Sequence, residues 1–296
     1  MERKPLRIAM ISLHSSPLGA VGTRDTGGMS IYIRELAKGL AGLGHSVDIF
    51  TRRQHKGQDP FLVVTEGVRV VHLDAGGWEP MPPAALSRHV QEFTRGVECL
   101  RAREGLAYDL LHSHYWLSGL AAGQLKEKWD IPIIQMFHTL ALLKNKIAKS
   151  PEELENESRI NGEKRVLQMA DRVVVATIDE QPHLDELYQA DVEKIVTIPP
   201  GVDTNRFYPI PEDEAKAFLN IPKDGKMLLF VGRIEPLKGI DTLIKAISQM
   251  RKSDVMSTCP HYLYIIGGDP NGEVIDEESE IHRLKRLCHD LGVDDL

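Results

Sequence analysis

The sequence lacks several features that would place it in well-defined classes of protein. It has three cysteines, Cys99, Cys259 and Cys288, an odd number at distant positions. A disulfide framework is therefore not expected, and a reducing, cytoplasmic compartment is favoured. No run approaches the roughly 20 apolar residues that a membrane helix needs. Ile8–Leu13 is also too short for the core of a signal peptide. We therefore expect no membrane span.

Positive charge is also in deficit. The sequence has 36 Lys and Arg residues against 43 Asp and Glu residues, which gives a net charge of −7. Nucleic acids and anionic membrane surfaces both select a basic face, so neither is expected as the main partner. The hydrophobic fraction of 42% is ordinary for a globular protein. At roughly 150 residues per domain, the 296 residues suggest two domains.

Short apolar runs alternate with helical patterns along most of the chain. In one helical pattern, Ile33, Ala37 and Leu40 recur at a spacing close to 3.6 residues. This alternation predicts a doubly wound α/β domain with helices on both faces of a parallel sheet. The predicted strands are Arg7–Leu13, Val47–Thr51, Val68–Leu73, Asp109–His114, Ile131–His138, Arg172–Thr177 and Lys194–Ile198. Further helices are predicted at 86–103, 117–129, 151–169 and 179–188.

A proline-rich stretch divides the chain. Pro-Pro-Gly at 199–201 and Pro-Ile-Pro at 209–211 precede a new β/α pattern, which begins at Met227–Ile234. We expect two Rossmann-like domains, residues 1–205 and 206–296. The second domain has two predicted strands, whereas a doubly wound unit usually has about five or six. We therefore expect the chain to stop partway through this domain. An open sheet edge there would favour self-association into a homodimer.

Two glycines open the helix that follows the first strand. Gly27 and Gly28 stand where free backbone N–H groups and the helix dipole attract a phosphate or a sugar oxygen. The alternative is a flexible loop in which the glycines serve only the turn geometry. Neither the Gly-x-Gly-x-x-Gly fingerprint nor a phosphate loop ending in Gly-Lys-Ser/Thr is present. Nicotinamide cofactors and ATP are therefore not indicated.

Histidines end two later strands, where ligands bind in open α/β sheets. His112 and His114 lie on one side of their strand because side chains alternate. As metal ligands they lack a third partner in the sequence, so packing beneath a loop is the favoured interpretation. Tyr115, just past the strand, is better placed to contact a ligand. His138 and Thr139 follow the next strand and offer polar groups to a substrate hydroxyl or phosphate, although a lone histidine is more often structural.

Three cations and a glycine complete the candidate residues. Arg159 lies in an acidic helix, where the structural alternative is an ion pair with Glu155 four residues earlier. Arg233 and Lys238 lie five residues apart after the first strand of the second domain, where both can clamp a diphosphate. Their alternative is a solvated turn. Gly268 follows the next strand and either approaches the same ligand or forms a turn.

Six motifs occur in an order that resembles the retaining glycosyltransferases of family four, which have the GT-B fold. They are Ser-Leu-His-Ser-Ser-Pro (12–17), Asp-Thr-Gly-Gly-Met-Ser-Ile-Tyr (25–32), His-Ser-His-Tyr-Trp-Leu-Ser-Gly (112–119), His-Thr-Leu (138–140), Pro-Pro-Gly-Val-Asp (199–203) and Val-Gly-Arg-Ile-Glu-Pro-Leu-Lys-Gly (231–239). The motifs are most similar to those of D-inositol-3-phosphate glycosyltransferases, with sucrose-phosphate synthase-like enzymes next. The resemblance implies two facing Rossmann-like domains, the first for a small acceptor and the second for a nucleotide-sugar. It implies a UDP-sugar as co-substrate and no cofactor.

The resemblance also implies a role for each candidate residue. Arg233 and Lys238 would stabilise the leaving diphosphate, where negative charge grows, and His138 would contact the donor sugar. These three would serve a retaining, front-face transfer that needs neither a metal nor a side-chain nucleophile. Gly28 and Gly268 would lie against the donor. The implied acceptor contacts are Gly27, Ser30, Tyr115, Thr139 and Arg159.

The sequence departs from the family pattern in two places. Ser30 stands where members that use inositol phosphate have Asn, and residues 78–86 lack their Lys, although Arg88 is near. A phosphorylated inositol acceptor is therefore left open. In the family the donor-binding Glu-x7-Glu motif belongs to the second domain, and residues 206–296 do not contain it, so the chain alone is expected to turn over poorly. The alternatives are a non-catalytic nucleotide- or sugar-binding module and a GT-B-fold sugar-nucleotide epimerase. The epimerase would need carboxylates around the sugar, and no such set accompanies the candidate residues.

Overall fold

The computed structural model describes residues 4–19, 27–79, 81–148, 150–253, 261–267 and 280–294. It divides into two compact units, whose boundary lies between Gly201 and Val202. The first unit is the larger and contains most of the candidate residues. The second contains Arg233 and Lys238.

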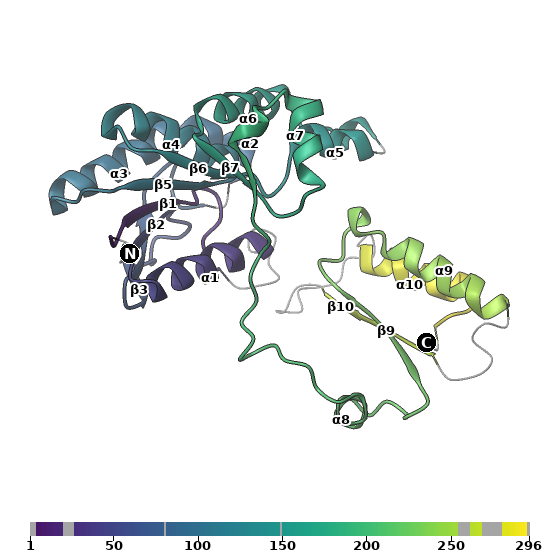
Figure 1. Ribbon diagram of the computed structural model, residues 1–296. Coiled ribbons are helices and arrows are strands. Elements are labelled where there is room, and N and C mark those ends of the chain that lie inside the picture. The colour runs from purple at the N-terminus through teal and green to yellow at the C-terminus, as the bar shows by residue number, and fades with distance from the viewer. Residues whose placement is uncertain are drawn as a thin grey trace. The chain divides into compact units, whose positions relative to one another are not determined.

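The first unit is built on one eight-stranded sheet (Figure 1). Its strand order is β3-β4-β2-β1-β5-β6-β7-β8, and each neighbouring pair is parallel except β3 with β4. The strands are β1 (Arg7–Ile11), β2 (Ser46–Arg52), β3 (Phe61–Thr65), β4 (Val68–Leu73), β5 (Leu110–His114), β6 (Ile133–Met136), β7 (Arg172–Val175) and β8 (Ile195–Thr197). The predicted doubly wound α/β fold is confirmed.

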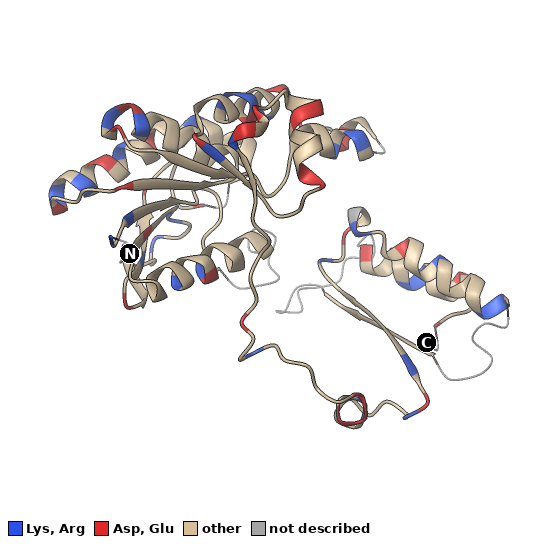
Figure 2. Cartoon of the chain, in the orientation of Figure 1, with Lys and Arg blue, Asp and Glu red and all other residues tan. Residues whose placement is uncertain are grey.

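Helices cover both faces of this sheet because its central strands are apolar on both sides. Ile8 and Met10 of β1 pack with α1 (Gly28–Gly42), whereas Ala9 and Ile11 pack toward α3 (Val90–Glu104) and α4 (Trp116–Trp129). Figure 1 shows α1 on one face and α3 and α4 on the other. The remaining helices are α2 (Pro83–Leu86), α5 (Ala141–Ile147), α6 (Glu157–Met169) and α7 (Glu180–Tyr188). Charged residues lie mainly on the helices and loops (Figure 2).

Two helices of the first unit approach each other closely through glycines. A Cβ atom on Gly119 of α4 would lie 2.5 Å from Cγ1 of Val166 in α6. A Cβ atom on Gly162 of α6 would lie 2.4 Å from Cε3 of Trp116 in α4. Real side chains do not pack this tightly. The pairing of α4 with α6 therefore requires glycine at both positions.

Several elements differ from the sequence-based expectations. The edge strand β3 was not predicted, although four of its five residues are apolar; in the structure it is largely exposed, and Val63 is 73% exposed. α5 and α8 (Glu212–Phe218), seven residues each, were also missed. The helix predicted at 151–169 begins only at Glu157. Asn156 caps it there by accepting a hydrogen bond from the backbone N–H of Arg159 at 2.9 Å.

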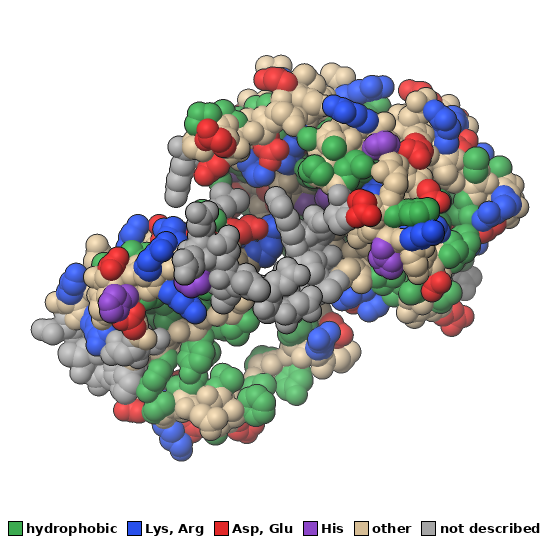
Figure 3. All heavy atoms as spheres, turned by 180° about the vertical axis from the view of Figure 1, so that it is seen from behind, with side chains coloured by type: hydrophobic (Ala, Val, Ile, Leu, Met, Phe, Trp, Pro, Cys, Tyr) green, Lys and Arg blue, Asp and Glu red, His purple; other side chains and the backbone are tan. Residues whose placement is uncertain are grey.

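The second unit contains a two-stranded parallel sheet formed by β9 (Lys226–Val231) and β10 (His261–Ile266). One face packs on α9 (Ile240–Lys252) and α10 (Glu280–Leu291) through a cluster that includes Ile244 and Leu284. The opposite face carries exposed apolar side chains, among them Leu229, Val231 and Ile266. Hydrophobic side chains gather on the surface of this unit (Figure 3). The strand predicted at Met227–Ile234 is confirmed as β9.

Two further features concern membrane-spanning helices and the cysteines. No helix in the described ranges is long and apolar enough to span a membrane. Cys99 is exposed and Cys288 half-buried, and both are free thiols. Cys259 lies outside the described residues.

Candidate functional site

Several candidate residues of the first unit follow the carboxyl ends of central strands, near the point where the strand order reverses. β1 lies between β2 and β5: the chain places β2, β3 and β4 on one side of β1 and then crosses to β5 on the other side. In doubly wound folds such a switch point opens a crevice at the carboxyl ends of the strands. His14 follows β1, Tyr115 follows β5, and His138 follows β6.

Four histidines at this edge, His14, His112, His114 and His138, form what we call the histidine cluster. The rings of His112 and His114 lie on the same face of β5 with centroids 4.4 Å apart, as predicted from strand alternation. The rings of His114 and His138 are 5.2 Å apart, and Nδ1 of His114 lies 3.0 Å from Nε2 of His138. His14 packs on Tyr115 with a centroid distance of 4.2 Å.

The histidine cluster is uncharged at neutral pH because its rings are desolvated. Burial lowers the pKa of His14 to about 3, with a smaller contribution from charge repulsion by His138 and Arg159. Burial also lowers the pKa of His112 and of His138 to about 4, and it holds the pKa of His114 well below 6.5. A neutral imidazole offers one donor and one acceptor, which suits an uncharged sugar hydroxyl.

Tyr115 and His138 share an unusual backbone conformation. Their φ angles are 73° and 63°, in the left-handed region. Among the described residues, the other non-glycine positions with positive φ are Asp130, Gln189 and Asn220, at helix C-termini where this conformation is ordinary. Tyr115 combines its φ with a ψ of 160°, which costs about 1–3 kcal/mol. Strain of this kind is concentrated at functional sites.

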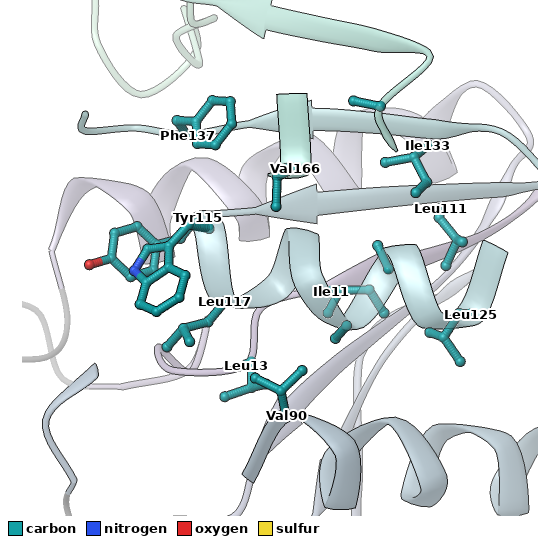
Figure 4. Packing of buried hydrophobic residues seen from close by; sticks show 14 of the residues in the cluster. Ile11, Leu13, Val90, Leu111, Tyr115, Leu117, Leu125, Ile133, Phe137 and Val166 are labelled. Carbon is teal, nitrogen blue, oxygen red and sulfur yellow. The ribbon is translucent and has the colours of Figure 1, made fainter. Parts of the chain in front are cut away.

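Tyr115 links the histidine cluster to Arg159. The guanidinium carbon of Arg159 lies 5.0 Å from the centre of the Tyr115 ring, a cation–π contact. Figure 4 shows Tyr115 at one end of the core, with its hydroxyl directed away from Ile11 and Leu111. The ring therefore belongs to the core, while its hydroxyl lies toward the carboxyl edge of the sheet.

Arg159 is buried and uses all three of its nitrogens. Nε donates to Glu163 at 2.9 Å, Nη1 to Glu155 at 2.7 Å, and Nη2 to Oγ1 of Thr139 at 2.9 Å. The ion pair with Glu155, which was the structural alternative for Arg159, is present, and the role of Arg159 in ligand binding remains a prediction. Glu155 is also paired with Lys144 and is 19% exposed, whereas Arg159 is 5% exposed. An anion that binds Arg159 must therefore compete with the Glu155 carboxylate.

Glu163 is a buried carboxylate that sequence reasoning missed. It accepts hydrogen bonds from Arg159, from the Tyr188 hydroxyl and from the backbone N–H of Ala141 at 2.9 Å. These bonds tie the start of α5, and with it the preceding Thr139, to α6 and α7. The available signal was an acidic residue four positions after Arg159.

The start of α1 is open around its glycines. Among the described residues, a Cβ atom on Gly27 or Gly28 would meet nothing within 4 Å. Ser30 is buried, and its Oγ lies 2.7 Å from Oγ of Ser15 in the loop after β1. This bond holds the loop against the helix. The roles of Gly27, Gly28 and Ser30 in ligand binding remain predictions.

The candidate residues of the second unit lie where β9 leads into α9. Arg233 pairs with Glu235 at 2.8 Å and is 48% exposed, and Lys238 is exposed at the end of a 3-10 helix, Pro236–Lys238. A Cβ atom on Gly267 would lie 2.0 Å from the carbonyl oxygen of Gly232, so the ends of β9 and β10 meet backbone to backbone. Gly268 lies outside the described residues.

Sequence reasoning also missed His14 as a member of the site. Like Tyr115 after β5, His14 comes a few residues after the buried strand β1, and that position was the available signal. Within the described ranges, no group of three or more His, Cys, Asp or Glu side chains is arranged to hold a metal ion.

Comparison with known proteins gives matches along most of the chain. The family profile described as "Glycosyl transferase 4-like domain" matches residues 27–201, and the profile "Glycosyl transferases group 1" matches residues 211–295. D-inositol 3-phosphate glycosyltransferase 2 of Catenulispora acidiphila is 39% identical over 297 aligned positions, which cover 100% of this chain and 69% of that protein. D-inositol 3-phosphate glycosyltransferase of Kineococcus radiotolerans is 40% identical over 90% of this chain and 61% of its own length.

A solved structure is similar as well. Sucrose-phosphate synthase from Thermosynechococcus elongatus has a TM-score of 0.83 at 30% sequence identity. The match covers 98% of this chain and 69% of that chain. The chain thus spans between 61% and 69% of the length of these three relatives.

Proposed function

Because the chain belongs to the group 1 glycosyl transferases, with a glycosyl transferase 4-like domain in its first unit, we propose that it serves the retaining transfer of a sugar from a UDP-sugar to a small hydroxylated acceptor. The observation that carries this proposal is the uncharged histidine cluster at the switch point of the sheet. A neutral imidazole there can form a hydrogen bond with a sugar oxygen without the cost of burying a charge.

The proposed donor contacts come from three residues. His138 contacts the sugar, and Arg233 and Lys238 bind the diphosphate. A guanidinium presents parallel N–H groups to phosphate oxygens, and an ammonium adds a point charge. As the bond between the anomeric carbon and the diphosphate oxygen breaks, negative charge grows on the diphosphate. Cations fixed beside it stabilise the transition state more than the ground state.

The proposed transfer needs no nucleophilic side chain. The acceptor hydroxyl attacks the anomeric carbon from the face that the diphosphate leaves. Its oxygen–carbon bond forms as the carbon–diphosphate bond breaks, and the departing phosphate oxygen takes the hydroxyl proton. The anomeric configuration is therefore retained.

For the acceptor we propose a phosphorylated polyol or sugar bound beside Tyr115, Thr139 and Arg159. Support comes from Arg159, which has a side-chain bond to Thr139 and a ring contact with Tyr115. The relatives named above are an inositol 3-phosphate glycosyltransferase and a sucrose-phosphate synthase. Arg159 is already paired with Glu155, so an acceptor phosphate would have to replace part of this ion pair.

Calorimetric titration of the chain with UDP and with UDP-glucose tests the proposal. Arg233→Ala and Lys238→Ala are each expected to weaken UDP binding by about 10- to 100-fold, because each removes a charge-assisted contact. Lys245→Ala is the matched control, since Lys245 is an exposed lysine of the same unit paired with Asp241. Absence of UDP binding by the wild-type chain, or affinity indifferent to both substitutions, would contradict the proposal.

A further inference from the structure

A buried histidine lies behind the histidine proposed to contact the sugar. His114 is completely buried, whereas His138 is partly exposed. Nδ1 of His114 and Nε2 of His138 are 3.0 Å apart, a hydrogen-bond distance between ring nitrogens. The Tyr32 ring forms T-shaped contacts with both imidazoles, with centroid distances of 5.9 Å to His114 and 5.4 Å to His138. The two imidazoles are therefore held as a pair.

The pair has two arrangements of its protons. Each ring is neutral at pH 7, because burial lowers both pKa values, and a neutral imidazole carries one N–H. If His138 donated from Nε2, the proton of His114 would lie on its own Nε2. If His114 donates from Nδ1, its Nε2 is a bare lone pair, and His138 carries its proton on Nδ1.

The second ring nitrogen of His114 distinguishes the two arrangements. Nε2 of His114 is buried and has no hydrogen-bond partner in the described part of the chain. In the protein backbone, a buried N–H without a partner is rarer than a carbonyl acceptor that lacks one, and we apply the same preference to the ring nitrogens. The arrangement in which His114 donates leaves only a bare acceptor there and is the less costly one.

We propose that His114 is a positioning residue that donates its Nδ1–H to Nε2 of His138 and so fixes His138 as the Nδ1–H tautomer. Nε2 of His138 then accepts the hydrogen bond from His114, and the Nδ1–H of His138 remains available to a ligand. His138 can therefore only donate at this position. It selects an oxygen acceptor, such as a sugar hydroxyl or ring oxygen, and disfavours a ligand N–H.

The tautomer follows from the histidine pair alone, whereas its use on a sugar oxygen rests on the proposed function. The backbone of His138 is also in a restricted conformation. Its φ of 63° lies in the left-handed region, which non-glycine residues rarely adopt, so the surrounding structure fixes the position of this residue. His112 provides a comparison. It lies on the same face of β5 and is buried, and no hydrogen bond to His138 is found among the described residues.

Nitrogen-15 NMR of the labelled wild-type chain at pH 7.5 tests the tautomer directly, since protonated and bare ring nitrogens resonate far apart. We expect His138 to be protonated on Nδ1 and bare on Nε2, and His114 likewise. A proton on Nε2 of either ring would overturn the proposal. This measurement needs no variant and so does not depend on whether a substituted core folds.

Three variants separate positioning from packing. His114→Asn keeps a donor near the place of Nδ1 and is expected to preserve the His138 tautomer. His114→Leu keeps the bulk but removes the donor, and it is expected to give a mixture of both tautomers. His112→Leu, the matched control, removes a neighbouring buried imidazole and is expected to preserve the tautomer. An unchanged tautomer in a folded His114→Leu chain would overturn the positioning role.

Addition of UDP-glucose separates this inference from the proposed function. We expect the ligand to shift the His138 Nδ1–H resonance and His114→Leu to weaken binding by about two- to tenfold, the effect of one hydrogen bond. If UDP-glucose binds and the Nδ1–H resonance does not move, the sugar contact is overturned while the tautomer assignment stands. If UDP-glucose does not bind, the proposed function fails and the tautomer measurement still decides the role of His114.

Discussion

Nε of Arg159 donates a hydrogen bond of 2.9 Å to the fully buried carboxylate of Glu163. Both side chains belong to α6, one turn apart, and solvent barely reaches either. Burial of an ion pair costs free energy because both charges lose their hydration. When one partner is removed, the desolvation cost of the remaining charge is no longer offset by the ion pair.

Glu163→Gln is therefore expected to lower the free energy of unfolding by up to about 3–5 kcal/mol, because the buried Arg159 then keeps only the partly exposed Glu155 as a counter-charge. Urea denaturation followed by circular dichroism measures the change. Asp241→Asn breaks the more exposed pair with Lys245 and serves as control, with an expected loss below about 1 kcal/mol. Equal losses in the two variants would show that the buried pair of Arg159 and Glu163 stabilises the fold no more than the exposed pair does.

Glu155→Gln is expected to strengthen the binding of inositol phosphate by about three- to tenfold, because the competing carboxylate on Arg159 loses its charge. Titration calorimetry measures the affinity. Glu157→Gln removes an exposed charge from the first turn of the same helix and is the matched control. Unchanged or weaker binding in Glu155→Gln would show that the ligand does not take the place of this carboxylate.

The chain is expected to lose stability as the pH falls from about 6.5 toward 4. The cluster histidines stay neutral when folded, with pKa values of about 4 for His112 and His138, whereas unfolded histidines bind protons below about 6.5. The unfolded state thus binds more protons in this window. Each such histidine can contribute up to about 1.4 kcal/mol per pH unit.

Urea midpoints at pH 7, 6 and 5 measure this dependence. His112→Leu removes one group whose pKa is lowered by burial and is therefore expected to make the dependence shallower. A midpoint that stays constant from pH 7 to pH 5 would contradict the desolvated state of the cluster.

Two glycine-to-alanine substitutions are expected to change stability in opposite directions. Gly119→Ala places a methyl group 2.5 Å from Val166 and is expected to cost about 1–3 kcal/mol through overpacking. Gly39→Ala, at an exposed position of α1 with open space around it, is expected to stabilise the chain by about 0.5–1 kcal/mol. Thermal unfolding measures both. A stabilising Gly119→Ala would show that α4 and α6 can move apart at little cost.

The large sheet could be predicted because its strands are buried on both faces and therefore read as continuous apolar runs. β3 was missed although four of its five residues are apolar: it lies at the edge of the sheet with its side chains largely exposed, and so short an apolar run does not by itself identify a strand. The predicted strand at Ile131–His138 also proved longer than β6, which ends at Met136. Phe137 and His138 leave the sheet as the backbone turns to positive φ at His138.

Parts of the site were predictable for a different reason. The pairing of Arg159 with Glu155 followed from helical spacing alone. The bond between Glu163 and Tyr188 joins residues 25 positions apart and depends on how α6 and α7 pack, which no local pattern encodes. The same holds for His114 and His138, whose contact depends on the register of β5 beside β6.

Selection for heat resistance and selection for sugar transfer are expected to favour different amino acids at position 115. Its backbone angles belong to a region that glycine occupies freely, so glycine there would relieve the stored energy. The same change would delete the aromatic ring that His14 and Arg159 both touch. The amino acid recovered at this position from a mutant library would therefore reveal which of the two pressures had acted.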